Sequence, residues 1–174
     1  MDMLVWLEQS ALARALKTSF VVYPLVNAAH IAAIGTLFAG VLLMDLRILG
    51  RFQTIPAEPF VALLRRVGLT AFAFAAATGV LMFSIRATEY AATGVFLAKM
   101  ALILLAGLNF LLFIRIAARD PDAPALRTLA MLSIVLWSGA LICGRFIGFV
   151  EPIRLRTVRR KMRVAGSISA SGKS

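Results

Sequence analysis

Four long apolar stretches constrain the fold of this chain more than any other feature. They cover approximately residues 20–44, 67–85, 95–114 and 129–150, and each is bounded by charged or turn-forming residues. A helix that crosses a bilayer needs about 20 mostly apolar residues, because the hydrocarbon core is about 30 Å thick and each residue rises about 1.5 Å. Buried helices of water-soluble proteins seldom reach such lengths without charged residues. The pattern therefore predicts four membrane-spanning helices.

The composition of the chain agrees with this prediction. Hydrophobic residues make up 61% of the 174 residues, charged residues only 16%, and the mean hydropathy is +0.90. A water-soluble domain of this length would not need so much apolar surface. Cys143 is the only cysteine and His30 the only histidine, so neither an intrachain disulfide nor a Cys/His zinc site can form within one chain. We expect an all-α fold, a transmembrane four-helix bundle.

The first 19 residues have a different pattern, which predicts an amphipathic helix at the membrane interface. One side of a helix from Leu4 to Lys17 is apolar and the other side is polar. The apolar side carries Leu4, Leu7, Ala11, Leu12 and Ala15, and the polar side Ser10, Arg14 and Lys17. Glu8 falls on the apolar side, so it needs a partner or access to water. We expect this interfacial helix to precede a transmembrane domain over 20–150.

The segment 151–174 is basic and ends in a Gly/Ser-rich stretch, which predicts a mobile tail. Basic segments next to a membrane helix pair with anionic lipid headgroups. A nucleic-acid partner is not expected, because no aromatic platform or binding motif accompanies the basic residues. We therefore interpret the formal net charge of +11 mainly as an indication of contact with anionic lipid headgroups.

Stripes of small residues predict close contacts between the helices. Residues Ala28, Ala32, Thr36 and Gly40 recur at every fourth position of the first span. Similar stripes are Ala71, Ala75 and Gly79 in the second span and Ala140, Gly144 and Gly148 in the fourth. Small residues at this spacing let helices approach closely in lipid. Because the stripe of the first span lies almost opposite its polar side chains, we expect that helix to be central or to contact another subunit, as in a homo-oligomer or a complex with a partner membrane protein.

His30 lies near the middle of the first span, where an imidazole is unusual. It shares a helix face with Tyr23 and Asn27, at spacings of three and four residues. Spans alternate in direction, so several polar residues of other segments should lie on the same side of the membrane as Asn27 and His30. These are Arg86, Glu89, Lys99 and Arg145. Charges inside spans are costly unless they pair, reach the headgroups or face a polar cavity. We expect a polar site with His30 at its floor.

Several roles for these residues remain open. His30 and Asn27 could form hydrogen bonds between helices, and Lys99 and Arg145 could extend to the headgroups. Alternatively, His30 could bind a metal ion or haem, relay protons or line a path for a solute. Haem held by two histidines is impossible within one chain, so a methionine, an open position or His30 of a second copy would have to complete it. Possible methionine ligands are Met82, Met100 and Met131.

At the other side of the membrane, the residues after the first span indicate a helix end. Gly50 suits a helix C-cap, and Asp45 could cap the helix or pair with an arginine such as Arg47. Asn109 in the third span is expected to form an interhelical hydrogen bond. Four spans put both termini on one side, but the basic residues do not decide which side that is.

Several of these motifs resemble an uncharacterised family of small bacterial four-helix membrane proteins. They are Trp6-Leu-Glu-Gln-Ser10, Tyr23-Pro24, Ala29-His30, Asp45-Leu-Arg-Ile-Leu-Gly50, the 99–109 helix and Gly144-Arg-Phe-Ile-Gly-Phe149. The resemblance covers about residues 4–150 and implies a bacterial inner membrane. A looser likeness to copper-resistance D and cytochrome b561-type bundles implies haem or metal ligands on membrane helices. The single histidine departs from the haem pattern of those bundles.

These observations lead to one functional prediction with two alternatives. We expect an integral membrane subunit that holds a haem or metal cofactor through His30, with Asn27, Arg86, Glu89, Lys99 and Arg145 around it. The alternatives are a non-catalytic accessory or anchor protein and a small-solute transporter. No set of catalytic residues is recognised, which favours a protein that is not an enzyme.

Overall fold

Residues 2–147 are described by the computed structural model, and within them the chain forms seven helices and no strand. This confirms the all-α prediction. The elements are α1 (Asp2–Glu8), α2 (Ala11–Thr18), α3 (Val22–Ile48), α4 (Ala57–Ile85), α5 (Ala87–Ala91), α6 (Gly94–Ala117) and Ala125–Ile147, which we call the last helix. The predicted basic tail, 151–174, lies outside the described residues.

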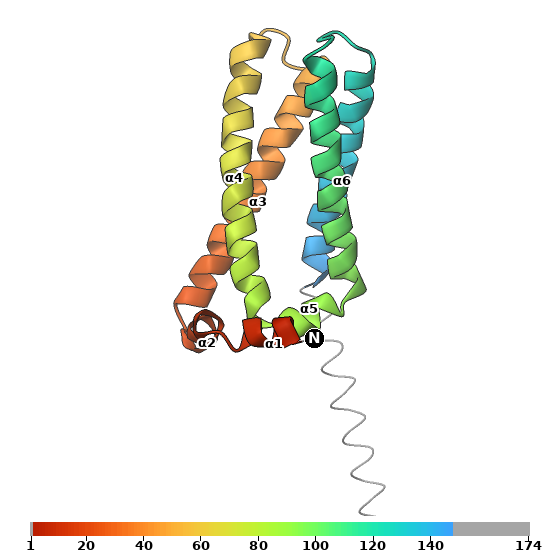
Figure 1. Cartoon of the computed structure of the whole chain (residues 1–174). Helices are drawn as coiled ribbons and strands as arrows, with labels where there is room; N and C mark the ends of the chain where they lie inside the picture. Colours follow the sequence, from red (N-terminus) through yellow and green to blue (C-terminus); the bar gives the residue numbers. More distant parts are fainter. Residues whose placement is uncertain (1, 148–174) are drawn as a thin grey trace, which may run out of the picture.

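The four long helices α3, α4, α6 and the last helix are each apolar and long enough to cross a membrane. They stand side by side as a bundle, and the three short helices lie at one end of it (Figure 1). The chain is therefore a multi-pass membrane protein with the expected four spans. The end of the last helix lies at the same end of the bundle as α1 and α2.

The predicted start of the second span was wrong by about ten residues. Helix α4 begins at Ala57, just after Pro56, and not at residue 67. Arg65 and Arg66 end the apolar stretch, but they do not end the helix, because arginine is compatible with helical backbone. Pro59 lies in the first turn, where its missing N–H needs no partner. The helix thus extends by more than two turns beyond its apolar part.

The predicted amphipathic helix from Leu4 to Lys17 is two helices, which corrects the prediction. Helix α1 ends at Glu8, and Ser10 begins α2 by accepting a hydrogen bond of 3.2 Å from the backbone N–H of Ala13. A serine N-cap favours a new helix start over continuation. The packed face also differs from the expected one: Ala13 and Leu16 are buried, whereas Leu12 is 54% exposed.

Helices α3 and α4 pack against each other closely. An added Cβ at Gly40 would lie 3.6 Å from the Leu64 carbonyl oxygen of α4 and 4.0 Å from Cα of Gly68. The predicted stripe on α4 is confirmed as a packing surface, since Ala71 and Ala75 are buried. The stripe on α3 is not: only Gly40 of that stripe is buried, and Ala28, Ala32 and Thr36 are exposed in the single chain.

The last helix contacts all three other long helices. Its Ser133 hydroxyl lies next to the Asp45 carboxylate of α3. Its Trp137 ring meets Phe72 of α4 edge to face, with centroids 6.4 Å apart. From α6, the Asn109 side-chain amide donates to the Leu129 carbonyl oxygen at 3.1 Å. This confirms the expected interhelical bond of Asn109. Ser133 is a neighbour of the Asp45 carboxylate, whose buried Oδ2 has no hydrogen-bond partner among the described residues.

The end of α3 confirms the predicted glycine C-cap. Gly50 has φ of +93°, in the left-handed region that favours glycine. The Gly50 N–H donates to the Arg47 carbonyl at 3.2 Å and the Arg51 N–H to the Leu46 carbonyl at 2.9 Å. This pair of bonds is a Schellman motif, which satisfies two carbonyls that the helix end would otherwise leave unpaired.

Candidate functional site

His30 forms a hydrogen bond across the α3–α4 interface. Its Nδ1 lies 2.8 Å from the Thr78 hydroxyl oxygen of α4. The imidazole is half-buried, and Thr78 is buried. The bond therefore joins two spanning helices at a depth where an unpaired polar group would be costly.

The hydrogen bonds of Thr78 identify the protonated ring nitrogen of neutral His30. The Thr78 hydroxyl donates to the Phe74 carbonyl oxygen at 2.6 Å. A hydroxyl has a single proton, and the Phe74 carbonyl is its shortest contact, so we assign Thr78 as the acceptor and Nδ1 as the ring nitrogen that carries the hydrogen. The Ala75 carbonyl, 3.3 Å from the same hydroxyl, also interacts with the ring and can only accept. In this tautomer Nε2 has no hydrogen and presents its lone pair, the form that ligates a metal.

Gly79 forms the floor on which the imidazole lies. A Cβ added to Gly79 would come within 3.2 Å of His30 Cε1, 3.8 Å of Nδ1 and 4.0 Å of Nε2. A distance of 3.2 Å is tighter than ordinary van der Waals contact. Glycine at this position thus allows the ring to lie directly on the α4 backbone, and the hydrogen bond to Thr78 fixes the ring's direction.

Lys99 is the second predicted site residue that the structure brings to His30. Its ammonium group, on α6, lies close enough to interact electrostatically with the imidazole. Its side chain lies across Gly144 of the last helix, where an added Cβ would be 3.7 Å from both Cε and Nζ. Cys143 also interacts electrostatically with Lys99. Lys99 therefore links His30 to α6, and through Gly144 and Cys143 to the last helix.

The other predicted site residues lie in different places. Asn27 is half-buried on α3, about one turn from His30, and Arg145 is exposed on the last helix. Glu89 pairs with Arg86 at 3.7 Å, and both belong to the segment around α5. Arg86 lines a pocket whose lining includes neither His30 nor Lys99. His30 and Lys99 thus form the centre of the site, and the roles predicted for Asn27, Arg86, Glu89 and Arg145 stay predictions.

Glu8, which the sequence left without a partner, caps α5. Its Oε1 accepts hydrogen bonds from the Thr88 backbone N–H at 2.8 Å and from the Thr88 hydroxyl at 2.7 Å. These two bonds lower the pKa of the Glu8 carboxyl below its usual value, since they stabilise the charged form. A carboxylate also suits the positive end of a helix. This contact holds α1 against the end of the bundle near the site.

Residues 3–150 match the family model of one family of unknown function, DUF6644. The chain belongs to this family. The match covers both short N-terminal helices and all four spans, so the family includes the whole region that carries His30, Thr78 and Lys99. No curated protein and no solved structure matches the chain. The bacterial origin and the likeness to copper-resistance D and cytochrome b561-type bundles, which the residue motifs suggested, therefore stay predictions for this DUF6644 member.

The geometry limits which cofactor one chain could hold. Within residues 2–147 no group of three or more His, Cys, Asp or Glu residues could hold a metal ion. A bare metal ion usually needs several protein ligands, whereas a haem iron can be held by a single histidine. Among the predicted methionine ligands, Met82 follows Thr78 by four residues and so shares its face of α4. Met131 lies near the start of the last helix, at the opposite end of the bundle.

Sequence reasoning missed Thr78 as a site residue and recognised Gly79 only as a packing residue. A threonine inside an apolar helix usually bonds to its own backbone, and Thr78 does so as well. The available signal was the spacing: Thr78 and Gly79 lie at nearly the same depth as His30 when the first two spans are aligned as an antiparallel pair. That alignment places a hydroxyl and a glycine beside the histidine.

Proposed function

We propose that this protein is a subunit of a bacterial inner membrane that binds haem through Nε2 of His30. The observation that carries the proposal is the hydrogen bond from Nδ1 to Thr78, whose own proton is directed to Phe74. A histidine ligand commonly donates its second ring N–H to a fixed acceptor, which orients the ring and raises the basicity of the ligating nitrogen. His30 has this arrangement.

The residues around His30 fit a haem better than a bare metal ion. Gly79 leaves room for the ring to lie flat on α4, and Lys99 supplies a positive charge close by. Haem propionates are anionic, so Lys99 would hold one of them by a charge-assisted hydrogen bond. A second axial ligand would come from Met82 or from His30 of a second copy, or that position would stay open. Bound haem would supply one-electron chemistry, which makes a role in electron transfer the working hypothesis.

The absorbance spectrum tests this proposal directly. We would purify the protein in mild detergent from membranes with an adequate haem supply and record oxidised and reduced spectra. The proposal expects a Soret band in the wild type, its loss in His30→Ala, and a retained but shifted band in Thr78→Val, because the valine keeps the ligand but removes the acceptor for Nδ1. The matched control is Thr70→Val, an exposed threonine two turns earlier on α4. Its spectrum should equal that of the wild type.

Two results would overturn the haem proposal. One is a featureless spectrum from haem-sufficient membranes, and the other is an unchanged Soret band in His30→Ala. Metal analysis on the same samples covers the case of a bare metal ion. A metal ion that is bound in equimolar amount and lost in His30→Ala would contradict the haem proposal. It would indicate a metal site shared between copies of the chain.

A second candidate function is that of a non-catalytic anchor in a membrane complex. The same hydrogen bond favours it, because a side-chain bond between α3 and α4 stabilises their packing by about 1 kcal/mol without any ligand. In this case His30→Ala and Thr78→Val would lower thermal stability by similar amounts, and a double variant would cost little more than either single one. Bound haem would be absent in all of them.

A further inference from the structure

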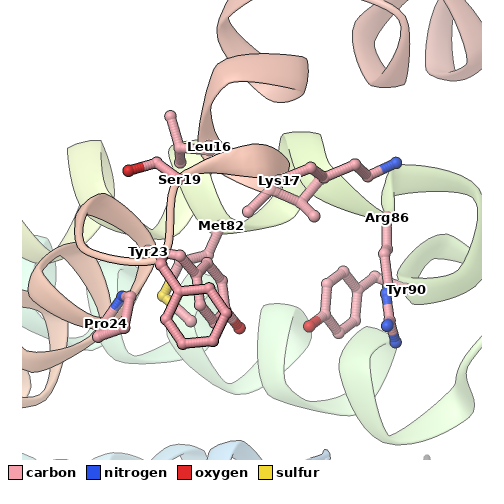
Figure 2. Close-up of a pocket in the computed structure, with 10 residues that line it drawn as sticks. Leu16, Lys17, Ser19, Tyr23, Pro24, Met82, Arg86 and Tyr90 are labelled. Carbon is pink, nitrogen blue, oxygen red and sulfur yellow. The ribbon is translucent and has the colours of Figure 1, made fainter.

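A pocket opens where the short helices meet the start of α3 and the end of α4. Its volume is about 520 Å³, within the usual range of ligand sites. Figure 2 shows the lining residues, and their side chains come from α2, α3, α4 and α5 and from the turns beside them. The lining consists of Leu16, Lys17, Ser19, Phe20, Tyr23, Pro24, Met82, Ile85, Arg86 and Tyr90.

Two tyrosine hydroxyls face each other across this pocket. Tyr23 comes from the first turn of α3 and Tyr90 from α5, and their hydroxyls point toward one another in Figure 2. The two groups are close enough to interact electrostatically. Burial raises the pKa of the Tyr90 hydroxyl above its usual value, so this hydroxyl stays protonated and can donate. Tyr90 is held by ring contacts with Phe83 and Phe96, at centroid distances of 6.3 and 5.9 Å.

The pocket also carries two cationic side chains. Lys17, from the last turn of α2, and Arg86, from the junction of α4 and α5, both belong to its lining (Figure 2). Each has an acidic neighbour: Arg86 pairs with Glu89, and Lys17 interacts electrostatically with Glu8. The Arg86–Glu89 pair is exposed and 3.7 Å long, so it contributes little to stability.

The rest of the lining is apolar and continues onto the outer surface of the bundle. Phe20 is 98% exposed and Leu25, farther along α3, is 63% exposed. The pocket lies at the end of the spans, where headgroups meet acyl chains. A ligand that suits both its basic and its apolar parts has an anionic head and a long hydrocarbon chain.

We propose that this pocket binds one anionic phospholipid, with the phosphate held between Lys17 and Arg86. The tyrosine hydroxyls donate to the phosphate or glycerol oxygens, and the acyl chains lie on the exposed apolar side of α3. Arg is well suited to phosphate because its planar N–H groups match the phosphate oxygens. A free phosphate would use the same cations but would leave the apolar wall facing water, so the lipid is the better match to the pocket.

Lipid selectivity in the purified protein tests this proposal. We would titrate delipidated protein in detergent with phosphatidylglycerol or phosphatidylcholine of the same acyl chains and count bound lipids by native mass spectrometry. The proposal expects one phosphatidylglycerol to bind at least fivefold more tightly than phosphatidylcholine. The double variant Lys17→Gln/Arg86→Gln should abolish that difference. In the matched control Arg65→Gln/Arg66→Gln, two exposed arginines of α4 outside the pocket, the difference should persist.

Competition by soluble phosphates and a variant without the tyrosine hydroxyls complete the test. Inorganic phosphate and glycerol phosphate should compete only weakly; competition as strong as that of the lipid would overturn the lipid assignment in favour of a soluble phosphate. Equal affinity for the two lipids, or selectivity unchanged in the double variant, would overturn the anionic site. Tyr23→Phe/Tyr90→Phe, checked for helix content, should weaken binding about threefold while both cations remain.

The basic segment 151–174 is kept in every variant, so lipid bound to it gives the same background in all of them, which is subtracted before affinities for the pocket are compared. The lipid proposal does not rest on the haem proposal, although Met82, one of the possible second ligands of the iron, also lines this pocket. His30 is not part of the pocket lining, so His30→Ala should lose the Soret band and keep lipid selectivity. A loss of both would indicate a folding defect of that variant and not a property of either site.

Discussion

At the scale of single residues, the imidazole of His30 is accommodated by two neighbours with different tasks. Thr78 provides the acceptor that a buried N–H requires, and Gly79 provides space. A buried donor without a partner would cost about 1–3 kcal/mol, so Thr78 contributes more by preventing that cost than by the net strength of the bond. The pair explains how one titratable ring can lie among apolar helices.

Gly79→Ala tests the space beneath the ring. The new Cβ would meet His30 Cε1 at 3.2 Å, so the ring must move by a few tenths of an ångström and its 2.8 Å bond to Thr78 must lengthen. We expect a stability loss of about 1 kcal/mol, measured by thermal unfolding in detergent. The control is Gly107→Ala in α6, where an added Cβ meets nothing within 4 Å. It should be neutral or slightly stabilising, and equal effects of the two changes would contradict this account.

At the scale of elements, Glu8 joins the short helices α1 and α5 by hydrogen bonds. Helix α5 has only five residues and no cap from its own side chains, so its first N–H groups need an outside acceptor. The Glu8 carboxylate supplies it from 80 residues away in the chain. The position of α1 therefore depends on the charge of one carboxylate.

The docking of α1 should depend on pH with a definite sign. Hydrogen bonds lower the folded-state pKa of Glu8, so its contribution is fully present above the unfolded pKa of about 4.3 and is lost as pH falls through the folded-state value. Spin labels at Met3 and Ala92 in a Cys143→Ser background would report it by double electron–electron resonance. We expect a narrow distance distribution at pH 7 that broadens only at pH values below the usual pKa of a glutamate, because the folded-state pKa of Glu8 is lowered.

Glu8→Gln separates charge from hydrogen bonding in that experiment. The amide still offers an oxygen to Thr88 but carries no charge, so the distance distribution should be broader than wild type and independent of pH. Glu58→Gln, which removes the acidic residue in the first turn of α4, should behave like wild type. Broadening that persists with the same midpoint in Glu8→Gln would assign the titration to another group.

The sequence predicted the long elements well and the short ones poorly. The spans were recognised because a stretch of about 20 apolar residues is typical of a membrane-crossing helix. The start of α4 was missed because an apolar stretch indicates the part of a helix inside the membrane, whereas the helix itself begins earlier, at Ala57. The break at Ser10 was missed because amphipathic periodicity continues through it, while the local bond from Ala13 decides the backbone. The position of a helix break such as this one depends on single local hydrogen bonds.

For the candidate site, the sequence placed Lys99 on the same side of the membrane as His30, and the structure brings the two together, but the sequence did not indicate Thr78 as a partner of His30. A lone histidine in an apolar span is conspicuous, and alternating spans place Lys99 on its side of the membrane. Thr78 was not found because the rotation of α4 about its axis, which turns the hydroxyl toward His30, results from packing of the whole interface. Arg86 and Glu89 were expected on the same side of the membrane as His30, and their ion pair at the start of α5 is compatible with that prediction without testing it.

At the scale of the whole molecule, four antiparallel spans make a prediction about topology. The α3–α4 loop and the loop after α6 lie at one end of the bundle, and α5 lies at the other (Figure 1). In a Cys143→Ser background, single cysteines at Gln53, Asp122 and Thr93 can be labelled with a membrane-impermeant maleimide. Gln53→Cys and Asp122→Cys should react from the same side and Thr93→Cys only from the opposite one. Reaction of all three from one side would rule out this arrangement.

The last helix also has a consequence for how the protein is made. It is the element that touches α3, α4 and α6, through Ser133, Trp137 and Leu129, and it is translated after all of them. Asp45 and Asn109 therefore enter the bilayer before these partners exist. The three earlier spans therefore complete their packing only after the last helix has been inserted.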